Sequence, residues 1–408
     1  MSLVNLLRSV RLPLVLASVS LLLGLSLLEV FLRVTHLQPD FFWQLDAEVG
    51  AIHIPAKKGW VVFRGGRQYI EINSLGYRDR ERSARKSPGT FRVALLGDSF
   101  VEAFQVGQAE TLAAILERRL NAECGAAPAT SFEVLNFGVS GFGTAEELET
   151  LRYRASEFAP DLVLLNLYTS NDLYDNSHEL DVEPDRLHYV LGPDGELQRL
   201  PFTVRDNAVK RWLRAHSYAY LFVRDRIKLS RARSIASATA LSMPTGDAGR
   251  QPRSRATLAG VQYLRQLPPA VTRAWQLTAA LIAEIEAEAN RQSARFGIVV
   301  IPNREEIETR GSRSDADSTN DYQQSLAKVD HICRELRTDC LQLADVFRGA
   351  PVDESYFPLD GHWTPKGHAR AAAATFEWMR RSGLVPCASR SQNVQALGPT
   401  TRRPAATP

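Results

Sequence analysis

Gly97, Asp98 and Ser99 follow directly on the apolar run 91–96. Aliphatic and β-branched residues that continue up to a glycine predict a short buried strand that ends there. Ser99 would then lie at the start of a helix, where free backbone N–H groups favour developing negative charge. The position suits a serine nucleophile, although Asp98 and Ser99 are also common residues of a helix cap.

Three further stretches have residue types that suit the same chemistry. They are NFGVSGFGT at 136–144, YTSND at 168–172 and LDGHWTPKGH at 359–368. In open parallel sheets, ligands bind beyond the carboxyl ends of the strands, where we expect all four stretches to lie. Together they supply a hydroxyl, a glycine-rich loop of backbone N–H groups, a side-chain amide and an acid/base pair, which are the groups that acyl transfer needs.

His362 is the predicted general base, and Asp360 is its predicted partner. In an extended segment, residues two apart project to the same side, so the Asp360 carboxylate would hold the imidazole N–H. The alternative is that Asp360 caps a turn and that His362 packs on Trp363. His368 lies one turn into the following helix and is expected to be structural.

An attack by Ser99 on a carbonyl needs donors for the oxyanion. We assign this role to the backbone N–H groups of Ser99 and Gly141 and to the side-chain amide of Asn171; the alternative for each glycine or asparagine is a plain turn. Ser140 is a rival nucleophile, but its surroundings miss the GxSxG pattern, because the second glycine is residue 143 and the pattern needs it at 142.

The polar residues Asp172, Asp175 and His178 suggest a metal site or a glycosidase carboxylate pair. Neither is favoured, because all three belong to one loop and a glycosidase pair comes from separated elements. The four cysteines form no CxxC or Cys/His spacing typical of zinc. We therefore expect neither a metal nor a cofactor.

The hydrophobic pattern predicts an α/β fold with a five-stranded parallel sheet. Predicted strands are 91–96, 132–137, 162–168, 297–301 and 341–346. They alternate with helices at 110–121, from Thr144, at 271–292 and from Thr364 to about Gly383. Glu147, three residues after Thr144, completes a capping-box pattern.

The amino end predicts a membrane anchor at residues 12–32. This segment is long enough to cross a bilayer and has one ionisable residue, Glu29. Arg8 and Arg11 precede it, so residues 1–11 should stay in the cytoplasm and the rest should face outward. A cleaved signal peptide is the alternative.

The remaining organisation is a lead-in segment at 38–90, a main domain at 91–386 with an insertion at 177–270, and a disordered tail at 387–408. Within the insertion, 207–232 is predicted to be one basic helix, and 234–255 a mobile stretch. The basic residues form either a solvated face or a contact with the membrane surface or an acidic glycan. Cys333 and Cys340 could form a disulfide, whereas Cys124 and Cys387 are too far apart in sequence to predict a pair.

In this order, the four stretches resemble the SGNH/GDSL hydrolase family, especially bacterial envelope members with an amino-terminal membrane helix. The resemblance covers about residues 73–380, apart from much of the insertion. It implies a flavodoxin-like three-layer α/β/α fold and serine-dependent ester hydrolysis. It also implies catalytic roles for Ser99, Asp360 and His362, with Ser99, Gly141 and Asn171 in the oxyanion hole.

Two positions depart from the family pattern. Thr169 stands where the third block usually has glycine, and Asp-Gly-His replaces the common DxxH spacing. With Trp363 next, this block is similar to the DxHW pattern of SGNH-like proteins that acetylate alginate, so an acyl group could pass either to water or to a sugar hydroxyl.

The sequence as a whole predicts a single-pass protein of the bacterial inner membrane with a periplasmic or extracellular serine esterase domain. Expected substrates are acylated glycans or small esters, in particular O-acetyl groups of an envelope or exported polysaccharide. The alternatives are a polysaccharide O-acetyltransferase and a catalytically inactive glycan-binding module. A formal net charge of +3 over 408 residues, without a readout motif, argues against nucleic acid as a partner.

Overall fold

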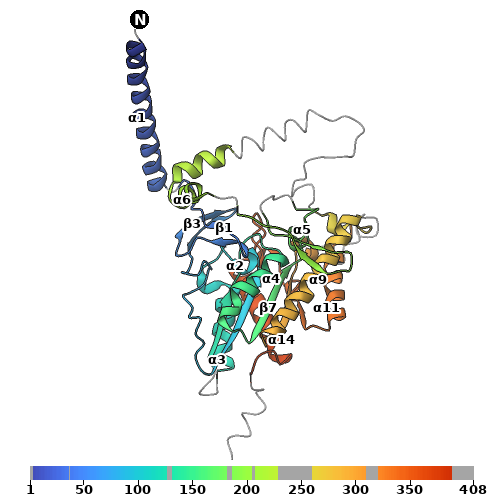
Figure 1. Cartoon of the computed structure of the whole chain (residues 1–408). Helices are drawn as coiled ribbons and strands as arrows, with labels where there is room; N and C mark the ends of the chain where they lie inside the picture. Colours follow the sequence, from blue (N-terminus) through green and yellow to red (C-terminus); the bar gives the residue numbers. More distant parts are fainter. Residues whose placement is uncertain are drawn as a thin grey trace, which may run out of the picture.

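A five-stranded parallel sheet forms the centre of the protein (Figure 1). The computed structural model describes residues 3–35, 37–125, 131–181, 186–204, 207–227, 260–308 and 320–387, with side chains from residue 13 onward. The strands are β5 (Thr90–Gly97), β6 (Ser131–Asn136), β7 (Leu162–Tyr168), β10 (Arg295–Ile301) and β11 (Cys340–Gln342). The predicted α/β class and the five parallel strands are confirmed.

Helices cover both faces of the sheet. One face packs on α3 (Leu112–Glu123) and α14 (Pro365–Arg381), and the other packs on α4 (Thr144–Tyr153), α9 (Pro269–Arg291) and α11 (Gln324–Leu336). Side chains alternate along β5, so Leu95 belongs to the first core and Ala94 and Leu96 to the second. This two-sided burial explains why the strands are continuous apolar runs.

The order of the strands defines where a site can form. Across the sheet the order is β11-β10-β7-β5-β6, so the chain moves outward on one side from β5 to β6 and then returns to the other side at β7. A doubly wound sheet opens a crevice at such a switch point, beyond the carboxyl ends of the two strands. Here those ends are Gly97 of β5 and Tyr168 of β7.

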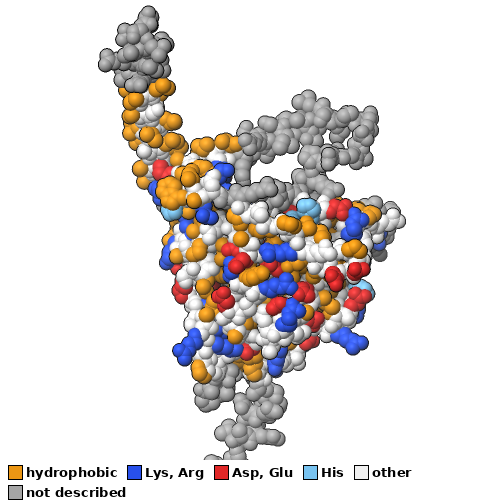
Figure 2. Space-filling model, viewed as in Figure 1, with side chains coloured by type: hydrophobic (Ala, Val, Ile, Leu, Met, Phe, Trp, Pro, Cys, Tyr) orange, Lys and Arg blue, Asp and Glu red, His pale blue; other side chains and the backbone are white. Residues whose placement is uncertain are grey.

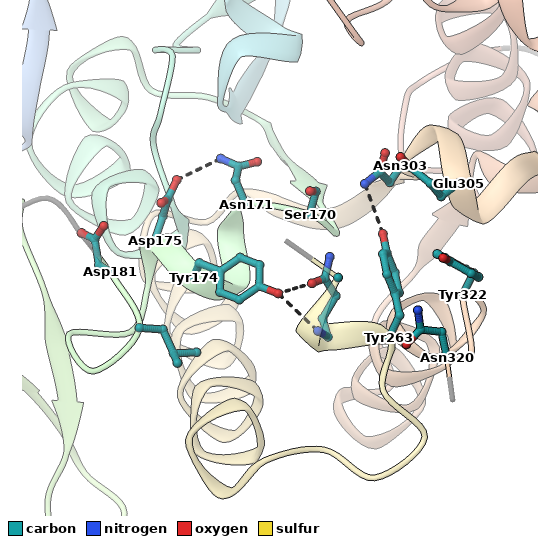
Figure 3. Close-up of a pocket in the computed structure, with 13 residues that line it drawn as sticks. Ser170, Asn171, Tyr174, Asp175, Asp181, Tyr263, Asn303, Glu305, Asn320 and Tyr322 are labelled. Atoms are coloured by element: carbon teal, nitrogen blue, oxygen red, sulfur yellow. Dashed lines mark hydrogen bonds between the residues drawn. The ribbon is translucent and has the colours of Figure 1, made fainter. Parts of the chain in front are cut away.

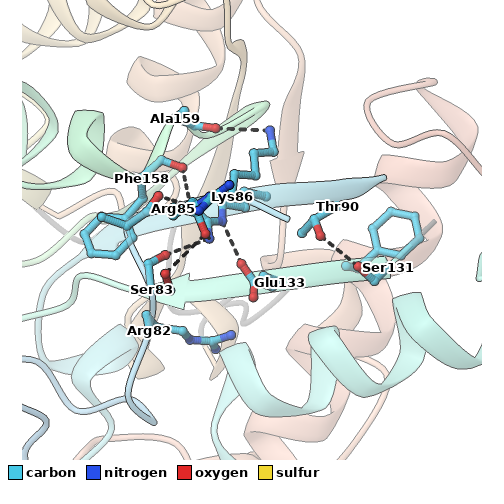
Figure 4. Close-up of polar contacts among 12 residues, drawn as sticks. Arg82, Ser83, Arg85, Lys86, Thr90, Ser131, Glu133, Phe158 and Ala159 are labelled. Carbon is cyan, nitrogen blue, oxygen red and sulfur yellow. Dashed lines mark hydrogen bonds and ion pairs between the residues drawn. The ribbon is translucent and has the colours of Figure 1, made fainter. Parts of the chain in front are cut away.

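A network of polar contacts fixes the opposite end of β5 (Figure 4). Arg92 pairs with Glu133 at 2.6 Å and donates to the carbonyls of Ser83, Ala84 and Phe158 at 2.7–2.9 Å. Because each of these contacts uses a different N–H direction, the guanidinium is satisfied although it is buried. The network joins β5, β6 and the segment before β5 at the edge away from the predicted site.

Two β-hairpins, which the sequence did not predict, form in the lead-in segment. They are β1 (Trp43–Asp46) with β2 (Gly50–His53), and β3 (Lys58–Phe63) with β4 (Gly66–Glu71). Phe42, Ile70 and Ile72 form a small separate core with Phe104, so the hairpins pack against the segment that follows α2 (Ser99–Glu102).

The insertion differs from the single helix predicted at 207–232. A short hairpin of β8 (Tyr189–Leu191) and β9 (Leu197–Arg199) precedes α6 (Ala208–His216), which ends where Ser217 is extended. Residues 218–227 form a second helix, and 228–232 and the predicted mobile stretch 234–255 lie outside the described residues. Basic residues continue on both sides of Ser217, so the charge pattern did not reveal the break between the two helices.

Three other local predictions need correction. The last strand ends at Gln342, because residues 344–347 form the short helix α12 (Ala344–Phe347). Gly143 caps α4, and its N–H donates to Glu146 rather than to a box that contains Glu147. Cys124 and Cys387 do form a disulfide, as do Cys333 and Cys340. Separation in the sequence was a poor guide to this pairing, because α3 and α14 lie side by side and bring their ends together. The Arg119 guanidinium of α3 lies 4.5 Å from the Phe376 ring of α14.

The remaining short elements connect the layers. They are η1 (Gln108–Glu110), η2 (Ala155–Phe158), α5 (Asp172–Asp175), η3 (Val261–Tyr263), α10 (Arg304–Glu308) and α13 (Val352–Ser355). At the amino end, α1 (Leu3–Thr35) extends away from the domain (Figure 1). Its residues Pro13–Thr35 have a mean hydropathy of 2.3 and are long and apolar enough to cross a membrane, a property that a signal sequence shares.

Candidate active site

Ser99 is the first residue of α2 and follows the carboxyl end of β5. The Asp98 carboxylate accepts a hydrogen bond from the Phe100 N–H at 2.9 Å and caps the turn. A side chain at Gly97 would collide with Val101 of the same turn, so glycine is needed for this tight passage from strand to helix. Asp98 is therefore a helix cap, as one interpretation of the GDS stretch had it, and this cap places Ser99 at the edge of the sheet.

Ser99, His362 and Asp360 form a hydrogen-bonded chain. The distance from His362 Nε2 to Ser99 Oγ is 2.7 Å, and that from His362 Nδ1 to Asp360 Oδ1 is 2.6 Å. The predicted reason for the second contact was wrong, because the segment is a turn rather than extended: Gly361 has φ of +85°. This left-handed residue folds the carboxylate back onto the ring and favours glycine at the middle position.

Aromatic side chains hold the imidazole in place. The Phe100 ring lies 5.1 Å from that of His362 and 5.0 Å from that of Trp363, which is fully buried. His368 is buried as well, and burial lowers its pKa to about 3, so the ring stays neutral. It packs on Trp363 at 5.3 Å, a position that fits the structural role expected of it.

The glycine-rich stretch is fastened directly to α2. The Asn136 amide donates to the carbonyl of Val101 at 2.8 Å, and a side chain at Gly138 would collide with the α2 backbone. Ser140 donates to Glu102 through both its N–H and its hydroxyl. Glu102 also pairs with the buried His53 at 2.6 Å. Asn136 belongs to a predicted stretch but was given no role, whereas Glu102 and His53 were not predicted at all. The hairpin that contributes His53 has no sequence pattern pointing to the site.

Gly141 and Asn171 are joined to each other through two buried charged residues. The Asn171 amide donates to Asp175 at 3.0 Å, and Asp175 lies 3.5 Å from Arg186. Arg186 in turn donates to the carbonyl of Gly141, whose φ of +82° favours glycine. Arg186 comes from the insertion and was not predicted. It links the loops after β6 and β7, which contain two of the predicted oxyanion donors.

Thr169, one of the departures from the family pattern, has a partner in the neighbouring strand's loop. Its hydroxyl donates to Glu306 at 2.7 Å and its N–H to the carbonyl of Ile301 at 3.2 Å. Burial raises the pKa of Glu306 to about 7. The threonine thus connects the ends of β7 and β10, and glycine could make the backbone contact but not the hydroxyl contact.

Three carboxyl groups, those of Asp98, Glu147 and Asp172, are buried at or near the turn that contains Ser99. Burial raises the pKa of Asp98 to about 7, and burial together with mutual repulsion raises the pKa values of Glu147 and Asp172 well above their ordinary range. Within the described residues, neither oxygen of Glu147 has a hydrogen-bond partner. At neutral pH, Glu147 and Asp172 therefore favour the protonated form in the folded protein.

The three acids make a pH-dependent contribution to stability. A carboxyl group whose folded pKa is raised stabilises the fold fully below its unfolded pKa of about 4, and this contribution is lost as the pH rises through the folded pKa. We expect Glu147→Gln to raise the melting temperature at pH 8 and to change it little at pH 5, since the advantage grows by up to about 1.4 kcal/mol per pH unit. Thermal unfolding followed by circular dichroism at both pH values measures this.

Glu157→Gln is the matched control, because it makes the same chemical change at an exposed position. Its effect should be the same at both pH values. An equal response of the two variants would show that Glu147 ionises normally in the folded protein.

Two cavities include residues of the candidate site in their walls. The first, of about 460 Å³, includes Asn171 and Asp175 and is lined by three tyrosines, Tyr174, Tyr263 and Tyr322 (Figure 3). Asn303 and Asn320 add amide groups, and the Asn303 amide bonds Tyr263 Oη at 3.2 Å. The second, of about 590 Å³, has Asp360 and Ser140 in its wall, and the rest of its lining includes Arg64, Glu102 and Gln105 as well as apolar side chains. It lies between β3 and the residues after α2, with Trp43, Val61, Val62, Phe63, Phe104 and Leu359 as its apolar lining.

Asp360→Asn tests the carboxylate that holds His362. We expect kcat to fall by roughly 10²–10⁴ with the fold intact, because an amide cannot stabilise the imidazolium and favours the wrong ring tautomer. Hydrolysis of a small chromogenic acetate ester measures the effect. Asp353→Asn, which removes an exposed carboxylate from α13, should leave the rate near that of the wild type. Equal rates for wild type and Asp360→Asn would contradict a role for this carboxylate.

The Gly-Asp-Ser turn that follows the first strand of the doubly wound sheet lies within the first of two family matches. The family described as GDSL-like lipase/acylhydrolase matches residues 93–193, which contain the first three of the four stretches. The SGNH hydrolase-like domain of the acetyltransferase AlgX matches residues 266–404, which contain the fourth. The chain therefore belongs to the SGNH/GDSL hydrolases and is an ester hydrolase of that type. No curated protein matches it.

Several solved structures are similar at low identity. An acetylxylan esterase from Geobacillus stearothermophilus is 13% identical, with 75% of this chain and 100% of that chain covered and a TM-score of 0.38. A lipase/acylhydrolase from Enterococcus faecalis is 11% identical (73% and 100% covered, TM-score 0.37), and the esterase EstA from a Pseudoalteromonas species is 10% identical (71% and 97%, TM-score 0.35). At these TM-scores the similarities say nothing about the substrate of this chain.

Proposed function

We propose that this protein is a serine esterase that removes acyl groups, in particular O-acetyl groups, from a glycan outside the cytoplasm. The observation that supports the proposal best is the chain of hydrogen bonds from Ser99 through His362 to Asp360, at 2.7 and 2.6 Å. These are the distances at which a base can take a proton from a nucleophile and a carboxylate can orient that base.

The proposed reaction has two steps. His362 Nε2 takes the proton of Ser99 as its Oγ attacks the ester carbonyl, and the oxyanion is stabilised by the N–H groups of Ser99 and Gly141 and by the Asn171 amide. The alcohol leaves with the proton from His362, which leaves an acyl group on Ser99. Water, activated by the same imidazole, then attacks the acyl group and releases the acid.

The cavity beside Asn171 favours a sugar over a fatty alcohol. Three tyrosines offer ring faces with polar tips, and the amides of Asn303 and Asn320 offer donors and acceptors for hydroxyl groups. A volume of about 460 Å³ lies within the range of small-ligand sites. The cavity includes Asn171, one of the proposed oxyanion donors, so a glycan unit bound there would lie next to that donor.

An assay with chemically acetylated oligosaccharides of neutral, amino and uronic sugars tests the substrate class. Release of acetate from at least one of them, faster than from a small chromogenic ester, is the expected result. A strong preference for long-chain esters over every acetylated sugar would contradict the glycan proposal.

Transfer to a sugar hydroxyl is the second candidate function. It is favoured by the match of residues 266–404 to the AlgX domain, whose description is that of an acetyltransferase. Incubation of a small acetate ester with and without an oligosaccharide acceptor separates the two functions. Ester cleavage only when the acceptor is present would indicate a transferase, and equal cleavage without it a hydrolase.

A glycan-binding module without activity is the remaining alternative. A fluorophosphonate reacts with an activated serine, so labelling of the purified protein at Ser99 would exclude this alternative. Glycan binding without labelling would favour it.

We also propose that α1 is retained as a single membrane span, with the domain in the periplasm of a bacterial inner membrane. The apolar stretch Pro13–Thr35 supports a span, and Arg8 and Arg11 before it favour a cytoplasmic amino end. An intact amino terminus by mass spectrometry and resistance to alkaline extraction are expected. A mature protein that begins after residue 32 would show that the segment is a cleaved signal.

A further inference from the structure

Helix α6 exposes apolar side chains next to the carboxyl end of α1, residues 29–35, which we call the foot of α1. Val209 and Trp212 are one turn apart and are 67% and 59% exposed. Lys210 and Arg211, also exposed, flank them with positive charge. In Figure 2 this region shows orange and blue side chains gathered where α1 meets the domain. Exposed tryptophan beside basic residues on one short helix is typical of helices that lie in a membrane interface.

The end of α6 is fastened to α1 by Glu29, the one ionisable residue that the sequence places in the predicted span. Its carboxylate accepts hydrogen bonds from the Ser217 hydroxyl and from the N–H groups of Tyr218 and Ala219, at 2.8–3.1 Å. Arg33 of α1 donates to the carbonyl of His216, the last residue of α6, and lies over the Tyr218 ring at 4.8 Å. These contacts fix α6 at the level of Glu29.

The exposure along α1 shows where a bilayer would end. Residues 13–27 are exposed along their whole length, whereas Leu28 and Glu29 are partly covered and Leu32 is buried. At about 1.5 Å per residue, Pro13 to Leu28 spans about 24 Å, and the helix continues on the amino side toward the roughly 30 Å of a hydrocarbon core. The outer boundary of the core then falls close to Glu29 and therefore to α6.

More apolar side chains lie at the same level. On α1 and just beyond it, Phe31 and Val34 are 53% and 74% exposed, and Leu37 is exposed as well. In the helix at 218–227, Val223 and Ile227 are exposed. Scattered single apolar residues would need no explanation, but a set grouped around the foot of a membrane helix does.

We propose that α6 and the foot of α1 form a membrane-binding surface that lies in the outer interface of the bilayer. Val209 and Trp212 occupy the boundary between headgroups and acyl chains, and Lys210 and Arg211 contact anionic phospholipid headgroups. The proposal goes beyond ester hydrolysis, and it rests on the retention of α1 as a span.

This surface would set the orientation of the active site. Lys57, next to β3, donates to the carbonyl of Ala215 in α6, and His53 of β2 pairs with Glu102 of α2. A short series of contacts thus joins α6 to the helix that begins with Ser99. In Figure 1, α2 and α5, which follow β5 and β7, lie toward the end of the domain that bears α1 and α6. The proposed surface would hold the edge of the sheet that contains Ser99 close to the bilayer.

Quenching of tryptophan fluorescence by brominated phospholipids measures the depth of Trp212. The full chain is reconstituted in nanodiscs that contain phosphatidylglycerol, with bromine on either shallow or deep acyl carbons. We expect shallow bromine to quench more than deep bromine, and most of the quenching to be lost in Trp212→Phe. Trp378→Phe, which changes a tryptophan of α14 that is 8% exposed, is the matched control and should keep the quenching.

A second variant tests the charges. Lys210→Glu combined with Arg211→Glu should weaken the quenching in nanodiscs with phosphatidylglycerol and leave ester hydrolysis of a small soluble substrate in detergent unchanged. Full quenching in Trp212→Phe would overturn the proposal. Release of the chain from membranes by alkaline extraction would show instead that the span itself is absent, and the proposed surface would then fall with it, while activity at Ser99 would be unaffected.

Discussion

Ser99→Ala should lower ester hydrolysis by roughly 10⁴-fold or more, which leaves only the rate that binding and the oxyanion donors support. The reason is chemical rather than structural: the hydroxyl is the one group in the triad that can form a bond to the acyl carbon, and its loss removes no buried apolar surface. Initial rates with a small acetate ester, and a melting temperature close to that of the wild type, are the measurements.

Ser140→Ala is the matched control for this prediction. Ser140 is the rival nucleophile of the sequence, and it lies on Glu102, the last residue of the helix that Ser99 begins. Its partner is a carboxylate without an adjacent free imidazole, since His53 is on the far side of Glu102 and also bonds the Gly76 carbonyl. Most of the activity should remain, and a fluorophosphonate should label Ser99 in this variant. An adduct on Ser140 would reverse the assignment.

His362→Ala should have a similarly large effect, roughly 10³-fold or more, because no other base lies within hydrogen-bonding distance of Ser99 Oγ among the described residues. Residues that act as a unit lose activity together, so Ser99→Ala combined with His362→Ala should be no slower than the slower single variant. Steady-state rates of the three proteins make up this comparison.

His178→Ala provides the control, because its side chain is exposed in the loop after β7 and its ring lies 5.1 Å from that of His188. Activity near that of the wild type is expected. Additive losses in the double variant would mean that His362 and Ser99 act independently, which is incompatible with proton transfer between them.

The sheet could be predicted from the sequence because each of its strands is buried on both faces. Runs such as Val93 to Leu96 have no polar residue, and short apolar runs that alternate with amphipathic helices indicate buried strands of a parallel sheet. The sequence around Thr364 likewise predicted the start of α14. In the structure, the Thr364 hydroxyl accepts a hydrogen bond from the Gly367 N–H, as expected of a helix cap.

The lead-in hairpins and the break in the insertion could not be predicted, because their structure depends on distant partners. In strand β3 most side chains are only half-buried, so its sequence has no clear apolar and polar alternation. Its packing against the cluster that contains Phe104 is a tertiary contact. Ser217 interrupts a helix-forming run because its hydroxyl and the next two N–H groups bind Glu29, 188 residues earlier in the chain.

At the candidate site, the sequence pointed to the groups that could react, and the structure added the residues that hold them. Ser99, Asp360 and His362 were predicted from residue type and spacing, and the structure brings them together. Arg186 and Glu102 were missed, since a buried arginine in an insertion and a glutamate after a serine have no short-range pattern. Both act on loops whose positions depend on the whole sheet.

The disulfide between Cys124 and Cys387 closes a covalent loop around most of the catalytic domain. The loop contains Asp360 and His362, whereas Ser99 lies before Cys124, on the part of the chain that also contains the amino-terminal helix. A protease that cuts the chain once anywhere between the two cysteines would therefore release nothing: the segment with the imidazole would stay tethered to the segment with the hydroxyl. Under reducing conditions the same cut would give two separate polypeptides, so the outcome of a single nick depends on the redox state of the compartment in which this protein works.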